Sequence, residues 1–234
     1  MKVSLNHLKE LVDTDVSAEK LSELFNLHSG EVEEYYKLIE ANNIVVGKVL
    51  SKEKHPDADK LSVCQVDLGD EVTQIVCGAP NVDTNQMVIV SKVGAELPGG
   101  FKIKASTIRG VESNGMICSL AELGLDKKFV YSDGIQVIKK DCKPGDNPLE
   151  VLDLNDEVMA LDLTPNRADL LSVMGVAFDT SAILDVPLKE KTIDIKESNK
   201  ECDVEIEIET ENCPSYYTRI IENVEIKESP QWIQ

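Results

Sequence analysis

HPDADKLSVCQVDLG, residues 55–69, is the stretch that decides the fold of the middle of this chain. The proline and two aspartates near its start are typical of a turn, and the apolar positions within Leu61–Leu68 predict a strand. Some forty residues later, RGVESNGMICS, residues 109–119, places a loop bounded by Gly110 and Gly115 before another apolar run. We therefore expect the two segments to form neighbouring rims of one small β-barrel.

The surrounding segment consists of short apolar runs separated by turn residues, which is typical of a β-barrel or β-sandwich. In the fifth run Phe101, Ile103 and Ala105 would face the core. Lys102 and Lys104 would lie together on the outer face, because side chains alternate along a strand. The expected strands are Ile44–Val46, Leu61–Leu68, Gln74–Cys77, Met87–Val90, Phe101–Ala105, Gly115–Cys118 and Ile135–Ile138.

Helical patterns flank this β-rich segment on both sides. The first forty residues predict two short helices, capped by Ser4 and Ser17, and a strand. A brief strand at Met159–Leu163 then precedes a helix that we expect to open with Asn166 as its N-cap and to end near Leu184. Neither flank has enough apolar surface for its own core. We therefore predict one split domain, residues 1–39 plus 151–190, interrupted by a domain at residues 40–150.

The predicted fold class is α+β: a five-stranded barrel inserted into a small split helical domain, followed by the start of a further α/β domain. In residues 200–234, Val204, Ile206 and Ile208 alternate with glutamates, which is typical of a strand with one solvated face. The chain stops at Gln234, soon after an apolar Trp232-Ile233 pair. We expect this last domain to be incomplete.

The charge of the chain bears on its partners. A net charge of -19 opposes binding to a polyanion. Residues 40–150, however, hold 13 Lys and Arg against 16 Asp and Glu, a net charge of -3, whereas the remainder carries -16. A nucleic-acid contact must therefore depend on a local basic patch within the middle segment.

The apolar runs and the cysteines indicate a cellular compartment. The longest apolar runs are much shorter than the roughly 20 residues of a membrane span. The N-terminus lacks the apolar core of a signal peptide, so we expect a cytoplasmic protein. The six cysteines form no C-x-x-C pair and have no histidines at zinc-finger spacing. Three lie within strand-like runs, so we expect buried free thiols rather than metal ligands.

Several motifs occur in an order typical of one protein family. The segments at 55–69 and 109–119 resemble the tRNA-binding oligonucleotide-binding-fold (OB-fold) domain of several aminoacyl-tRNA synthetases. Over its whole length the chain resembles the N-terminal part of the bacterial phenylalanyl-tRNA synthetase beta subunit. The additional motifs are CGAPNV at residues 77–82, GAELPG at 94–99, ELGL at 122–125 and TPNRAD at 164–169.

This resemblance implies a part in an enzyme that joins phenylalanine to its tRNA with ATP and magnesium, as a tetramer of two alpha and two beta chains. In that family the alpha chain carries the aminoacylation site. The residues of the beta chain's editing site lie in the domain that begins near residue 200. We therefore expect no catalytic site and no bound cofactor in this chain. The resemblance implies tRNA and the alpha subunit as partners. It implies no binding to DNA or to a membrane.

The candidate RNA contacts lie on the two rims and on the fifth run, with Lys92, Lys54 and Lys60 as possible neighbours. The basic ones are candidate phosphate contacts, although a solvated strand face would explain them equally well. Ser113 and Asn114 could bond sugar or base edges, and Met116 offers an apolar platform, but spacing alone also fits a plain hairpin loop. The full set is Lys54, His55, Lys60, Lys92, Lys102, Lys104, Arg109, Ser113, Asn114 and Met116.

Two other functions remain open from the sequence. The barrel could be a protein-interaction module that supports assembly with the alpha subunit without contacting RNA, which the acidic flanks favour. His55, Asp57 and Asp59 could also hold a metal ion for a small hydrolase, because imidazole and carboxylates are competent ligands. The plainer interpretation is that both aspartates bond nearby backbone N–H groups of a turn.

Overall fold

The computed structural model describes residues 1–129, 134–189, 192–227, 229 and 233. The chain forms two compact units, Met1–Lys189 and Glu190–Gln234. Within the described ranges, every helix is too short or too polar to cross a membrane. The first unit is a mixed α+β structure that contains two larger sheets.

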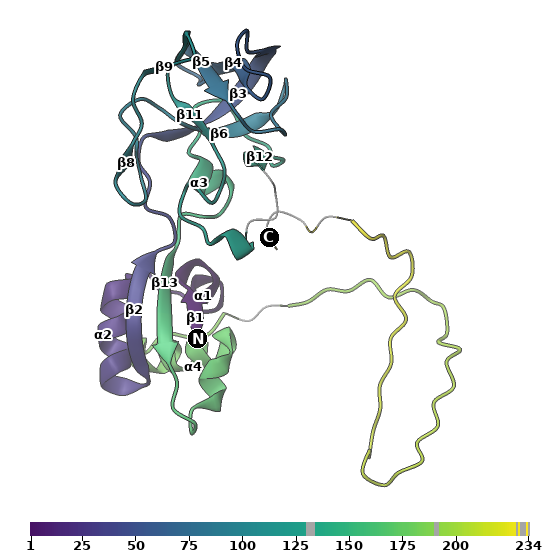
Figure 1. Ribbon diagram of the computed structural model, residues 1–234. Coiled ribbons are helices and arrows are strands. Elements are labelled where there is room, and N and C mark those ends of the chain that lie inside the picture. The colour runs from purple at the N-terminus through teal and green to yellow at the C-terminus, as the bar shows by residue number, and fades with distance from the viewer. Residues whose placement is uncertain (130–133, 190–191, 228, 230–232, 234) are drawn as a thin grey trace. The chain divides into compact units, whose positions relative to one another are not determined.

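The smaller of the two sheets joins segments from distant parts of the chain. Its antiparallel strands are β1 (Lys2–Ser4), β13 (Glu157–Asp162) and β2 (Glu31–Lys37), in the order β1-β13-β2 (Figure 1). The central strand β13 therefore lies more than a hundred residues from both of its neighbours. We call these three strands the small sheet.

Three helices share a core with the small sheet: α1 (Leu5–Leu11), α2 (Ala18–His28) and α4 (Val173–Leu184). The predicted N-caps of the first two are confirmed, because Ser4 Oγ accepts from the N–H of His7 and Ser17 Oγ accepts from the N–H of Lys20. The buried residues of this core are Val3, Leu5, Leu8, Leu11, Val12, Ala18, Leu21, Phe25, Met159, Leu161, Leu170, Val176 and Ala177.

The predicted start of the last helix is wrong. A short 3-10 turn, η2 (Ala168–Leu171), occupies the expected first turn, and α4 begins only after Ser172. Ser172 has the extended backbone of an N-cap, and its Oγ accepts from the N–H of Gly175 at 3.0 Å. Ser172 therefore takes the capping role that the sequence analysis gave to Asn166.

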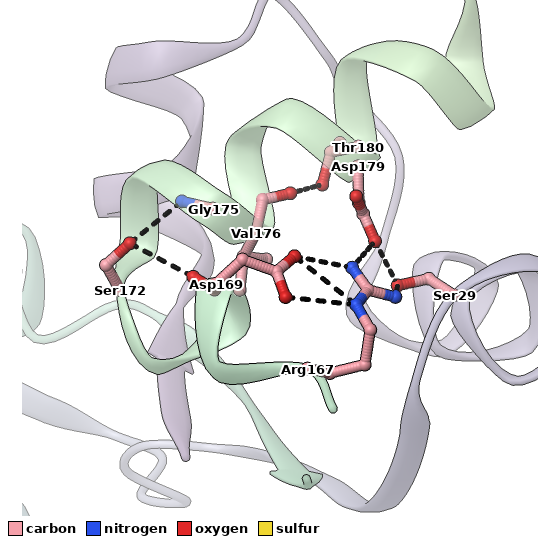
Figure 2. Close-up of polar contacts among 8 residues, drawn as sticks. All are labelled: Ser29, Arg167, Asp169, Ser172, Gly175, Val176, Asp179 and Thr180. Carbon is pink, nitrogen blue, oxygen red and sulfur yellow. Dashed lines mark hydrogen bonds and ion pairs between the residues drawn. The ribbon is translucent and has the colours of Figure 1, made fainter. Parts of the chain in front are cut away.

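Arg167 ties the turn before α4 to the end of α2 (Figure 2). Its guanidinium donates to Asp169 at 2.8 Å and to Asp179 of α4 at 2.6 Å. The hydroxyl of Ser29, the C-cap of α2, donates to the same Asp179 carboxylate. These bonds raise the pKa of Arg167 and lower the pKa of Asp169. One cation thus fixes η2, α2 and α4 to one another.

The larger sheet, which we call the curled sheet, is antiparallel with the order β11-β6-β3-β4-β5, and β12 also pairs with β6 (Figure 1). Val88 and Val90 of β6 pack into one apolar cluster and Ile89 packs into another, so both faces of the sheet are covered. Its strands are β3 (Ile44–Lys54), β4 (Ser62–Asp67), β5 (Val72–Cys77), β6 (Met87–Ser91), β11 (Met116–Cys118) and β12 (Val137–Ile138).

The long strand β3 produces much of the curl. Its first half pairs with β6 and its second half with β4, and the register shifts between Val49 and Ser51. Gly47 lies just before this change of partner. A Cβ atom there would lie 2.7 Å from methyl carbons of both Val66 and Val90, so only glycine lets the strands pack this closely.

Side-chain and backbone bonds bring the two ends of the strand order together. The N–H of Asn114, just before β11, donates to the carbonyl of Gln74 in β5 at 2.8 Å. The N–H of Val76, also in β5, donates to Ser113 Oγ at 3.1 Å. The sheet therefore curls towards closure, as the prediction of a barrel requires.

The run predicted at Phe101–Ala105 is mostly not a strand. Only β8 (Phe101–Lys102) is extended, paired with β7 (Glu96–Leu97) across the Gly99-Gly100 turn. Ile103 is buried as predicted, but Phe101 and Ala105 are exposed. The strands of this hairpin have only two residues each, which is too short to hold side chains alternately on the core side and the solvent side. Phe101 therefore faces solvent, and the chain is no longer a strand after Lys102.

The remaining elements of the first unit are short. A second hairpin, β9 (Ser106–Ile108) and β10 (Val111–Ser113), turns at Arg109-Gly110. The helical ones are η1 (Lys127–Phe129) and α3 (Pro148–Val151), the latter capped by Asn147.

The second unit has no helix or strand in its described residues. Exposed ion pairs join Lys200 to Glu222 at 2.7 Å and Arg219 to Glu197 at 2.9 Å. The strand expected around Val204–Glu209 is therefore not present. Its alternating apolar side chains remain exposed, and an unpaired strand has neither a ladder nor a packed face to stabilise it.

Candidate nucleic-acid interface

The turn at residues 55–61 lies beside the β9–β10 hairpin, as the sequence analysis predicted for two rims. His55 is only 2 % exposed, and its Nε2 lies 3.0 Å from the carbonyl oxygen of Ile108. Its Nδ1 accepts from the N–H of Asp57 at 3.1 Å, so the imidazole proton lies on Nε2 and is donated to Ile108. Arg109 adds a second link by donating from Nη1 to the carbonyl of Asp57 at 3.1 Å.

A hollow of about 810 Å³ opens next to these rims. Its wall includes the end of β5, the segment from Phe101 to Ile108 and the segment around β11. The exposed Phe101 and the half-buried Met116 provide apolar surface, and Lys102, Lys104 and Lys127 provide positive charge. The hollow therefore combines the two kinds of group that single-stranded nucleic acid needs, apolar faces for bases and cations for phosphates.

One acidic side chain, Glu122, also lines this hollow. Its carboxylate accepts from both the N–H and the hydroxyl of Ser119, at 2.6 and 2.8 Å. These bonds hold Glu122 on the loop after β11. Among the described residues of its lining, three lysines stand against one engaged glutamate, so this part of the hollow is positive within a strongly acidic chain.

The predicted basic contacts differ in how far their charge is already compensated. Lys92 is bound by Asp70 at 3.0 Å and Glu71 at 3.2 Å, and these bonds raise its pKa. Lys54 pairs with Asp59 at 2.6 Å, and Lys102 has only a longer contact of 3.7 Å with Glu96.

Two other basic candidates, Lys60 and Lys104, are exposed, and no acidic partner within ion-pair distance is found for either among the described residues. Lys104 lines the hollow, whereas Lys60 lies on the turn at 55–61. Of the predicted basic contacts, the two that line the hollow are therefore Lys102, with its single long contact, and Lys104, with no ion pair among the described residues.

The polar candidates contribute to the architecture of the rims. Ser113 is 2 % exposed and bonds β5 through its hydroxyl, and the buried His55 joins the rims. Asn114 is half-buried, and its backbone N–H and carbonyl both bond β5. Met116 lines the hollow as a half-buried platform.

Phe101 and Lys127 also line the hollow and were not among the predicted contacts. Phe101 is 59 % exposed and was expected to face the core. The Gly99-Gly100 pair was the signal available in the sequence. Both glycines have positive φ, 80° and 77°, and form a tight turn, so the side chains after the turn do not continue the alternation of those before it. The Lys127-Lys128 pair gave no signal beyond its charge.

The alternative of a metal site finds no donor set. Among the described residues no group of three or more His, Cys, Asp or Glu side chains could hold a metal ion. Both nitrogens of His55 bond the backbone, and Asp59 pairs with Lys54. The expected bonds from the two aspartate side chains to backbone N–H groups are not found in this described turn either.

The cysteines of the curled sheet are buried free thiols, as predicted. Cys64, Cys77 and Cys118 are all buried and unpaired. Burial raises the pKa of Cys64 to about 11 and the pKa of Cys118 to about 12. These thiols remain protonated and act as small apolar groups at neutral pH.

Comparisons with known proteins agree with this geometry. Residues 44–147 match the family described as "Putative tRNA binding domain". The whole chain aligns with the "Phenylalanine--tRNA ligase beta subunit" of Staphylococcus haemolyticus at 46% identity and with that of Shouchella clausii at 45% identity, covering 100% of this chain in each case. The chain spans about 30% of the length of these relatives.

A search of solved structures matches the C-terminal domain of Plasmodium vivax p43 at a TM-score of 0.32 and 23% identity, over 44% of this chain and 56% of that chain. A TM-score this low does not establish a shared fold. The sequence comparisons do not depend on that match: the chain is similar over its whole length to the N-terminal part of phenylalanine–tRNA ligase beta subunits, and its residues 44–147 belong to the family described as "Putative tRNA binding domain".

Proposed function

We propose that the chain is the tRNA-binding and assembly region of a phenylalanine–tRNA ligase beta subunit. In this proposal residues 40–150 are a five-stranded OB-type barrel inserted into a split domain of residues 1–39 plus 151–190. The observation that carries it is the hollow beside the two rims, which concentrates Phe101, Lys102, Lys104 and Lys127 within the matched range 44–147.

The state of the lysines supports a phosphate contact. Lys102 is 63 % exposed at its side chain, and its distance to Glu96 is 3.7 Å. An exposed ion pair of this kind contributes about 0–1 kcal/mol, so a phosphate can replace the glutamate at little cost. Lys104 has no such competitor among the described residues. These two lysines are therefore the proposed primary contacts, with Arg109 and Lys60 on the neighbouring rims as further ones.

The aromatic content sets the character of the binding. Phe101 is an exposed ring of the hollow, so a base can stack on it, and Met116 extends the apolar surface. Base–aromatic stacking is worth about 1–3 kcal/mol for each base and tolerates any sequence. Binding should therefore depend strongly on salt and only weakly on sequence. The buried His55 and Ser113 position the rims and do not contact RNA in this proposal.

The activity of a complete ligase is proposed for the parent enzyme only. Such an enzyme would use ATP and magnesium to charge tRNA with phenylalanine, as a cytoplasmic tetramer of two alpha and two beta chains. The described residues of this chain supply no set of donors that fits a metal ion. In this proposal the aminoacylation site belongs to the alpha chain, and residues 200–234 begin an editing domain.

Titration with a phenylalanine tRNA transcript at several salt concentrations tests the tRNA proposal. The variant Lys102→Ala/Lys104→Ala should weaken binding and lower the slope of log K against log salt by about 1.4–1.8, since each phosphate contact contributes about 0.7–0.9. Lys20→Ala is the matched control, an exposed lysine of α2 outside the matched range. A slope that is the same in the double variant and in the wild type would exclude both lysines as contacts.

The second candidate function is assembly with the alpha subunit without RNA contact. The acidic remainder of the chain favours it, because a net charge of -16 outside residues 40–150 repels a polyanion. Capture of a purified alpha subunit by this chain, together with no tRNA binding even at low salt, would support assembly over RNA recognition.

A further inference from the structure

Helix α4 carries an apolar stripe on its solvent side. Leu171, just before the helix, is 67 % exposed, and Met174 and Phe178 are 46 % and 57 % exposed. Ala182 is exposed one turn later. Met174, Phe178 and Ala182 follow one another at intervals of four residues, so they lie on one face of the helix, and Leu171 belongs to the η2 turn that leads into it. We call these four residues the α4 stripe.

The α4 stripe is not the core-facing side of the helix. Val176, Ala177 and Thr180 face the core and are fully buried. A surface helix in a soluble domain normally presents polar residues opposite its buried face. Helix α4 presents apolar residues both on its buried face and on its solvent face. A continuous group of exposed apolar side chains marks an interaction site.

The charged side chain within α4 does not interrupt the stripe. Asp179 is the only charged residue from Leu170 to Leu184. Its carboxylate turns towards Arg167 and Ser29 rather than along the stripe (Figure 2). The network that fixes α2 to α4 therefore also keeps the solvent face of α4 free of charge.

The surroundings of the stripe are acidic. The segment 164–186 contains one basic residue, Arg167, against Asp169, Asp179 and Asp185. Arg167 is enclosed by two of these carboxylates, at 2.8 and 2.6 Å, so its positive charge is compensated. Asp169 remains half exposed, and Asp185 lies exposed at the end of the helix. A second copy of the chain would bring the same negative charges against them.

We propose that the α4 stripe docks an amphipathic helix of a partner protein whose apolar residues are flanked by lysine or arginine. Apolar positions at i, i+3 or i+4, and i+7 on that helix would pack on Leu171, Met174 and Phe178, and its basic flanks would face Asp169 and Asp185. The surface lies outside residues 44–147 and is thus separate from the proposed RNA site.

Binding of a synthetic helix to the complete chain tests this docking site. The probe is a labelled amphipathic peptide of about 18 residues built from leucine and lysine, a length that supports a helix. Fluorescence anisotropy at about 150 mM salt limits non-specific charge attraction. Met174→Ser and Phe178→Ser should each weaken binding about ten-fold, as expected for a central apolar contact.

Controls separate docking from charge attraction. Val72→Ser removes an equally exposed apolar side chain, 57 % exposed on β5, and should leave peptide affinity unchanged. A matching peptide of leucine and glutamate, and a scrambled leucine and lysine peptide without the stripe, should both bind much more weakly. The serine variants keep the net charge, so a loss of affinity in them reports apolar contact.

Several results would overturn the proposal. One is equal peptide affinity in Phe178→Ser and wild type, and another is equal binding of the acidic and basic peptides. A third is concentration-dependent dimerisation in sedimentation that Phe178→Ser abolishes, which would assign the stripe to a second copy. Phe178→Ser should not change the affinity for tRNA, because the stripe lies outside the proposed RNA site. If the wild-type chain failed to bind tRNA, the docking proposal would therefore be unaffected.

Discussion

Replacement of His55 by Ala, Gln and Asn measures how strongly one buried imidazole holds the two rims together. His55→Ala removes the Nε2 bond to Ile108 and the Nδ1 bond from Asp57, and it leaves a cavity where a 2 % exposed ring lay. Each lost hydrogen bond costs about 1 kcal/mol, and the cavity adds about 1–2 kcal/mol. We therefore expect the free energy of unfolding to fall by about 3–4 kcal/mol.

The two other variants separate the two bonds. Gln can place an N–H group near the position of Nε2 and keep the bond to Ile108, whereas Asn can place an oxygen near Nδ1 and accept from Asp57. Asn leaves the carbonyl of Ile108 without a protein donor, which costs about 1–3 kcal/mol if water does not replace it. We expect stability in the order wild type, Gln, Asn, Ala.

Urea denaturation followed by circular dichroism measures these differences as shifts in the midpoint at constant slope. Lys60→Ala, an exposed change in the same turn, is the control and should stay within about 0.5 kcal/mol of wild type. A loss below about 1 kcal/mol for His55→Ala would refute the role assigned to the imidazole.

Three further predictions concern the rest of the first unit. Arg167→Met should be less stable than wild type at pH 7, and this difference in stability should narrow as pH falls below about 4, because the lowered pKa of Asp169 gives a contribution that is progressively lost as this carboxyl is protonated; thermal melts at pH 7 and pH 3 check it. Gly115→Ala should lower stability by about 1–3 kcal/mol in urea titrations, since its φ is 129° and a Cβ would lie 2.9 Å from a backbone oxygen. A thiol reagent should modify the exposed Cys202 in the native protein but reach Cys118, whose pKa is about 12, only after unfolding, as mass spectrometry would show.

The parts of the fold that sequence predicted well are those with a strong local signal. The strands of the curled sheet at Ser62–Asp67, Val72–Cys77, Met87–Ser91 and Met116–Cys118 follow apolar runs bounded by turn residues. Ser4 and Ser17 begin helices because a hydroxyl before an amphipathic stretch satisfies free N–H groups.

The errors occur where tertiary contacts decide between local alternatives. Asn166 and Ser172 are both good caps, and the bonds of Arg167 to Asp169 and Asp179 favour a tight turn before the later one. Phe101 follows two glycines, and its exposure depends on the two-residue hairpin rather than on the alternation in its own run. The pattern of apolar and polar residues along the sequence contains no information about either of these contacts.

The candidate site shows the same division. Lys102 and Lys104 were predicted from alternation and line the hollow. The compensation of Lys92 by Asp70 and Glu71 was not visible, because those acids lie about twenty residues away in the chain and meet it only in the folded sheet. Burial of His55 was hidden for the same reason, since its partner Ile108 belongs to another hairpin.

The pairing of β2 with β13 has a consequence for the order in which the molecule folds. Lys37 lies opposite Glu157, so closing this pair from an unfolded chain orders a loop of about 120 residues. Backbone bonds between Val46 and the Gly145-Asp146 pair bring the ends of the intervening segment together. Once these bonds form, the effective loop shrinks to about 20 residues and the entropic cost falls by about 1.5 kcal/mol. The curled sheet should therefore form first, and mutations that slow its formation should delay the small sheet as well.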